Sequence, residues 1–170
     1  MNQGKPVLPE PWLRGTLTEV SAVPRAVLHA LELAQEDIWK WCFPLSDRQL
    51  NEGPERIAPV AFHLRHIARS LDRLLTYAEG GALDETQLAL LKSELDGEAQ
   101  HDPLFAELQA ALDRSTSRVR QLASADLETP RTVGKKQLPT TIGGLLVHVA
   151  DHTLRHVGQA ITTAKLVAKH

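Results

Sequence analysis

The chain has 170 residues, a formal net charge of −2 at pH 7 and a pI near 6.4. This length predicts a single domain with a buried core, and the charge lacks the basic excess of nucleic-acid-binding proteins, so we expect no nucleic-acid partner. Only 4% of the residues are aromatic, and the aliphatic residues that dominate the apolar share favour helices packed through aliphatic stripes.

Residues 1–20 form an irregular arm in our prediction, because three prolines fall within the first eleven residues. That same stretch lacks the apolar core and basic flank of a signal peptide. No later run approaches the roughly twenty apolar residues of a membrane span. We therefore expect a soluble, cytoplasmic protein without a membrane partner.

A first helix is predicted from about residue 24 to 42, where apolar residues recur at helical spacing until Pro44 stops it. Cys42, the single cysteine of the chain, cannot form an internal disulfide. It follows Trp39 and Trp41 in an apolar stretch, which favours a buried, inert thiol over a nucleophile.

The next segments are a connection over residues 46–59 and a second helix from about 59 to 79. Ser46 and Gln49 have the spacing of a capping box, so the connection is expected to hold a short helix. The second helix shows the clearest amphipathic pattern of the first half. A shorter helix is predicted over 84–94, and its apolar stripe is formed by Leu88, Leu91 and Leu95.

A third helix is predicted to begin at Asp102 or Pro103 and to end near residue 122. The helical period then disappears over residues 124–139, which form a long loop with a short extended piece around Thr132 and Val133. The last helix runs from 140 or 141 to about 168. Four long helices without strand alternation predict an all-α, four-helix bundle over residues 1–170, with a long crossover loop before the last helix.

Five histidines fall on two of these helices: His63 and His66 on the second, and His148, His152 and His156 on the last. Side chains four residues apart on a helix share a face and can bind one ion together. Residues eight apart are separated by about 12 Å, so His148 and His156 do not share an ion. The spacing leaves two alternatives, His148 with His152 or His152 with His156.

The apolar stripe of the last helix chooses between them, since a site in the bundle needs inward-pointing ligands. Measured around the helix from the stripe centre, His156 lies at about 60°, His152 at about 100° and His148 at about 140°. The second pair is therefore preferred. On the second helix His63 lies at about 70° and His66 at about 130°, so periodicity alone favours His63.

The stretches FHLRHIARSLDRLL and HVADHTLRHVGQ resemble the DinB-like (DinB/YfiT-like) superfamily of metal-binding four-helix bundles. In that family a histidine before a Leu/Ile-Ala pair on helix two joins a His-x-x-x-His pair on helix four. The resemblance therefore implies His66, His152 and His156 as metal ligands, with His63 either the ligand in place of His66 or a partner that supports it. It also implies a homodimer as the common assembly.

Three neutral imidazoles leave an ion with open coordination positions, which is typical of catalytic sites, and zinc or nickel suits such ligands. Asp151 or Arg155 could fix the imidazoles from the same helix. The family resemblance implies a metal-dependent enzyme, a thiol S-transferase or hydrolase that acts on a small-molecule substrate. The thiol would be an external low-molecular-weight cosubstrate. The alternatives are a non-catalytic, stress-associated metal-binding or interaction bundle, and a protein that binds no metal.

Overall fold

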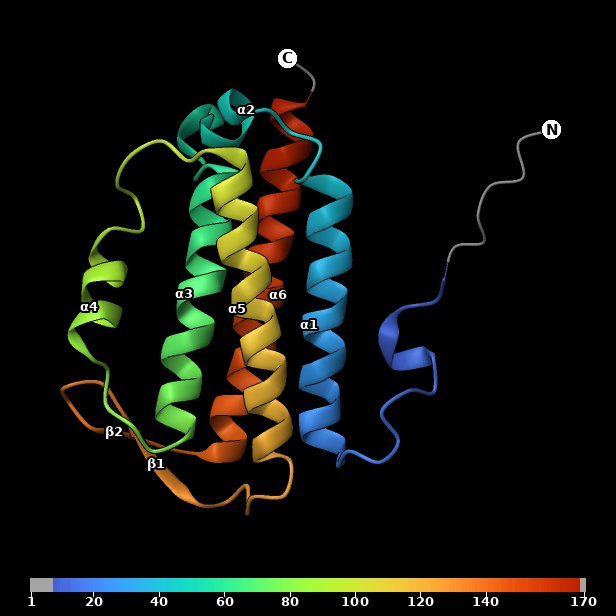
Figure 1. Cartoon of the computed structure of the whole chain (residues 1–170), viewed down its shortest axis with the longest axis vertical. Coiled ribbons are helices and arrows are strands. Elements are labelled where there is room, and N and C mark those ends of the chain that lie inside the picture. Colours follow the sequence, from blue (N-terminus) through green and yellow to red (C-terminus); the bar gives the residue numbers. More distant parts are fainter. Residues whose placement is uncertain (1–7, 169–170) are drawn as a thin grey trace.

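The computed structural model describes residues 8–168, and within this range four long helices lie side by side as a bundle (Figure 1). They are α1 (Ala22–Trp41), α3 (Val60–Ala78), α5 (His101–Leu122) and α6 (Ile142–Val167). Helices α1 and α3 each pack against both α5 and α6. The all-α fold class predicted from the sequence is confirmed.

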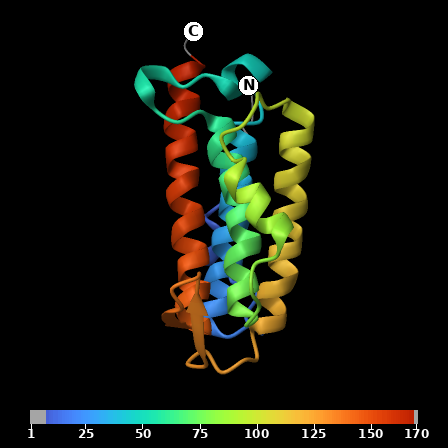
Figure 2. The ribbon, with the colours of Figure 1, turned by 90° about the vertical axis from the view of Figure 1, so that its left-hand side faces the viewer.

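The directions of the long helices determine the paths of the connections from α1 to α3 and from α3 to α5. Figure 1 shows α1 and α6 running upward and α3 and α5 running downward. The chain passes from α1 to α3 through α2 (Asp47–Asn51) and the 3₁₀ turn η2 (Pro54–Arg56), and returns along the bundle from α3 to α5 through α4 (Glu85–Lys92). Helix α4 lies over α3 in the view of Figure 2.

The connection before the last helix is more structured than the predicted loop. It carries a hairpin of two antiparallel strands, β1 (Pro130–Val133) and β2 (Leu138–Thr141), and joins helix ends that lie at the same end of the bundle. The connection that runs the length of the bundle is instead the one between α3 and α5. Gly134 starts the hairpin turn with φ +68°, a conformation that costs glycine little.

The predicted stripes of the long helices form the core. Leu64, Ile67 and Leu71 of α3 are fully buried, and so is the stripe of α6 at Ile142, Val149, Thr153, Ala160, Ala164 and Val167. The predicted stripe of α4 is wrong, because Leu88, Leu91 and Leu95 are 38%, 42% and 74% exposed. Helix α4 packs on α3 through a buried polar residue, Gln87, which donates to Thr76 and Asp72.

The remaining boundaries follow local capping chemistry. Ser46 and Gln49 form the predicted capping box of α2. Helix α5 begins at His101, one residue before the predicted Asp102. The described part of the arm holds a 3₁₀ turn, η1 (Pro11–Leu13), and is fastened to α1 by Arg14.

Within residues 8–168, no helix combines the length and the apolar character that crossing a membrane would need.

Candidate metal centre

Helices α3 and α6 bring the histidines together, because they run antiparallel and pack against each other along their length. His63 and His66 lie in the first half of α3, and His152 and His156 lie in the middle of α6. One turn separates the members of each pair, so both pairs present imidazoles toward the seam between the two helices.

His66, His152 and His156 form a group in which one ring nitrogen from each lies within 4.8 Å of the others. Nε2 of His66 lies 2.8 Å from Nε2 of His152. Two nitrogens bound to one tetrahedral zinc ion would lie about 3.3 Å apart, so a small rotation of either ring fits an ion between them. The donor set and its spacing therefore suit a divalent metal.

The charge state of the rings also suits a metal. Burial lowers the pKa of His152 to about 4, with a further contribution from the neighbouring His156, His66, His148 and Arg155. The pKa of His156 is lowered as well, first by burial and then by His66 and Arg155. Both imidazoles are neutral at pH 7 and keep a lone pair for an ion.

His63 is not in this group, although it lies beside it. Its side chain is deeply buried, at 4% exposure, and its Nδ1 lies 3.0 Å from Nδ1 of His156. Burial lowers the pKa of His63 to about 4, with smaller effects from His156 and His66. Because His156 uses Nδ1 toward His63, its Nε2 is the nitrogen left for an ion.

Two further residues complete the surroundings of His66. Nδ1 of His66 lies 2.6 Å from Oε2 of Glu94, in the connection between α4 and α5, and Oε1 of Glu94 accepts from Arg73 at 2.7 Å. The ring of Phe62 stacks on that of His66, with centroids 5.5 Å apart. Sequence patterns did not single out Glu94. The signal that the sequence offered was indirect. Arg65, Arg69 and Arg73 are spaced four residues apart and so share one face of α3, and this face binds the segment that carries Glu94.

The structure separates His148, Asp151 and Arg155 from the group. His148 is exposed and is not a member of the group, although its ring centroid lies 5.3 Å from that of His152. Arg155 donates to Asp151 at 2.6 Å on the exposed face of α6. Among the described residues, the hydrogen-bond partners that the grouped histidines have outside the group are His63 and Glu94 rather than Asp151 or Arg155.

Fold and site together define an all-α bundle with a candidate three-histidine metal centre at the seam of two antiparallel helices. Residues 30–160, more than half of the chain, match the family model of the DinB superfamily, so the chain belongs to the DinB superfamily. The family predicted by the sequence motifs is confirmed. Searches of curated proteins and of solved structures found no match.

Proposed function

We propose that the protein binds a divalent metal ion through His66, His152 and His156, and that it is a metal-dependent enzyme acting on a small-molecule substrate. The observation that carries this proposal is the convergence of three imidazole nitrogens, within 4.8 Å of one another, from two helices of a DinB-superfamily bundle. Zinc and nickel are the ions that suit an all-imidazole set.

The chemistry follows from the charge of such a site. Three neutral ligands leave the double charge of an ion uncompensated and coordination positions open, so a bound ion would lower the pKa of a water or thiol toward neutrality. A thiol S-transferase or a hydrolase therefore fits best. The thiol comes from outside the chain, because the only cysteine, Cys42, is buried.

The protein's own part is to hold the rings. His63 restrains His156 through the contact between their Nδ1 atoms, and Phe62 stacks on His66 and limits its rotation. All three grouped histidines are half-buried rather than sealed in the core. Each ring is therefore partly accessible from the surface of the bundle.

Metal content tests the binding step. Elemental analysis of untagged protein should find stoichiometric zinc or nickel, and His152→Ala should remove it. His148→Ala is the matched control, since His148 lies one turn away on the same helix but outside the group. Equal metal content in all three proteins, or metal below stoichiometry in wild type, would contradict the proposal.

Turnover tests the catalytic step. Wild-type protein given low-molecular-weight thiols and a panel of electrophiles, or hydrolysable esters and amides, should show activity that a chelator and His152→Ala both abolish. Stoichiometric metal without turnover of any substrate would instead support the non-catalytic metal-binding alternative. Activity indifferent to both treatments would rule out a metal-dependent mechanism at this site.

A further inference from the structure

We propose that Glu94 belongs to the metal centre as the residue that positions His66, an inference that rests on the proposed metal-binding function. Glu94 lies outside the two helices that carry the histidines, in the connection between α4 and α5. Its Oε2 nevertheless lies 2.6 Å from Nδ1 of His66.

The contact fixes which nitrogen of His66 carries the proton. A carboxylate only accepts hydrogen bonds, so Nδ1 of His66 must donate to it. In the neutral ring the lone pair then resides on Nε2, and this is the atom that faces Nε2 of His152 at 2.8 Å. Glu94 thus selects the tautomer that a metal ion at the three-histidine group requires, as carboxylates do behind many metal-binding histidines.

The burial of Glu94 indicates why two partners are needed. Glu94 is 6% exposed, and burying a carboxylate is costly unless it is paired and hydrogen-bonded. Arg73, 8% exposed, donates to the other oxygen, Oε1, at 2.7 Å. His66 takes the remaining oxygen, Oε2, so both oxygens of the buried carboxylate have a hydrogen-bond partner.

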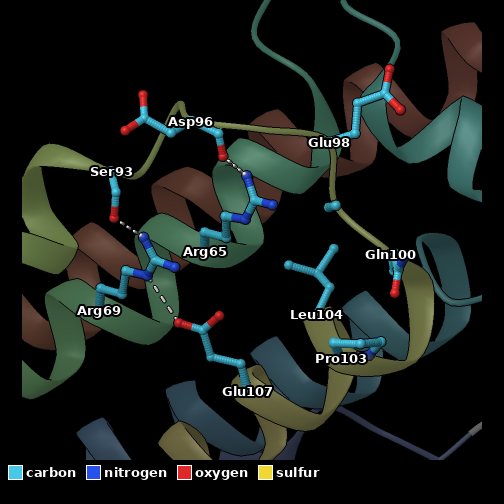
Figure 3. A pocket seen from close by; sticks show the side chains of 10 residues that line it. Arg65, Arg69, Ser93, Asp96, Glu98, Gln100, Pro103, Leu104 and Glu107 are labelled. Atoms are coloured by element: carbon cyan, nitrogen blue, oxygen red, sulfur yellow. Dashed lines mark hydrogen bonds and ion pairs between the residues drawn. The ribbon is translucent and has the colours of Figure 1, made fainter.

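Two more arginines hold the backbone that carries Glu94. Arg65 donates to the carbonyls of Asp96 and Gly97, both at 3.1 Å. Arg69 donates to the carbonyl of Leu90 at 3.0 Å and to Ser93 Oγ at 3.3 Å. Figure 3 shows Arg65 and Arg69 side by side under this segment, which borders a pocket of about 360 Å³. The arginines, spaced four apart on α3, bind the connection on both sides of Glu94.

Removing the carboxylate should loosen His66 without touching any proposed ligand. The ring could then rotate and exchange tautomers. Binding of the ion would have to order the ring again, and this would reduce the binding free energy. Loss of a partner of this kind typically weakens metal affinity by roughly 10- to 100-fold.

Metal titration tests the proposal with zinc and nickel as the probes. Relative to wild type, Glu94→Ala should weaken affinity by roughly 10-fold or more, and Glu94→Gln, whose amide oxygen still accepts, should recover part of the loss. Glu98→Ala is the control, an exposed acid of the same connection, and should stay within about twofold. A loss below about fivefold for Glu94→Ala, or an equal loss for Glu98→Ala, would overturn the proposal.

Nitrogen-15 NMR of the imidazoles gives a readout that does not depend on bound metal or on any variant folding. In metal-free wild-type protein the His66 ring should be the Nδ1–H tautomer, and its Nδ1 proton should exchange slowly with water. A ring protonated mainly on Nε2 would overturn the assignment of Glu94. If wild type binds neither metal, the proposed function fails on the titration alone, while this spectrum still decides the contact between Glu94 and His66.

Discussion

Cys42, at the C-terminal end of α1, has a fully buried side chain. Burial, with a smaller effect from Asp37, raises the pKa of its thiol to about 12. At pH 8 the thiol is therefore both protonated and shielded, and we expect no reaction with iodoacetamide in the native protein. Mass spectrometry after timed exposure measures this, and the same protein in guanidinium chloride, where the thiol should react fully, is the control. Rapid native alkylation would refute the prediction and reopen Cys42 as a nucleophile.

The two histidines of α3 show what periodicity can and cannot predict. His63 lies nearer the apolar stripe and is the more deeply buried of the two, so the helical pattern gave its burial correctly. His66, which the family motif favours, lies outside the stripe, is only half-buried and meets His152 across the seam. A site at the seam of two helices needs residues beside the stripe rather than at its centre, and a single-helix pattern does not reveal which neighbour lies there.

Glu94 marks the limit of sequence reasoning at this scale. It occupies a connection without a regular period, and its approach to His66 depends on three arginines of another element. Nothing local to Glu94 distinguishes it from Glu98, which is exposed. Only the tertiary fold separates the two.

At the scale of elements, Thr141 is the N-cap residue of α6. Its Oγ1 accepts from the backbone N–H of Gly144 at 3.0 Å and satisfies one of the unpaired donors of the first turn. Thr141→Ala should therefore lower the free energy of unfolding by about 1 kcal/mol, whereas Thr141→Ser should keep most of it. Chemical denaturation of the metal-free proteins measures both.

Thr162 provides the control for the cap on the same helix. It is exposed within α6, and its hydroxyl donates to the carbonyl of Gly158 one turn back. Such a bond contributes little, and alanine has the higher helix propensity, so Thr162→Ala should be neutral or slightly stabilising. Equal losses from Thr141→Ala and Thr162→Ala would show that the cap is not the cause.

The long helices were predictable because prolines, glycines and aliphatic stripes mark them over many turns. The hairpin was predicted only in part, since strands of four residues carry too short an alternation to stand out and only the piece around Thr132 and Val133 was expected. The apolar stripe predicted for α4 was wrong for a different reason. That helix packs on α3 through hydrogen bonds of Gln87 to Asp72 and Thr76, which an apolar stripe cannot indicate.

For the whole molecule, the location of the candidate site would link metal binding to folding. His66 belongs to α3, in the first half of the chain, and His152 and His156 belong to α6 at its end. An ion bound by all three would bridge two antiparallel helices. His66 and His152, which meet across the seam, are separated by 86 positions in the sequence. Such a site exists only in the folded bundle, so the ion should bind the native state far better than the unfolded chain.

This linkage predicts a metal-dependent melting temperature. At a free metal concentration of 100 times Kd, the native state gains about 2.7 kcal/mol, which for a chain of this size raises Tm by roughly 5 to 10 °C. Calorimetry of metal-free protein, with and without added zinc or nickel, measures the shift. His152→Ala should lose it because the group is left with two imidazoles, and His148→Ala should retain it because its ring lies outside the group. A shift of the same size in wild type and His152→Ala would mean that the metal acts elsewhere on the protein.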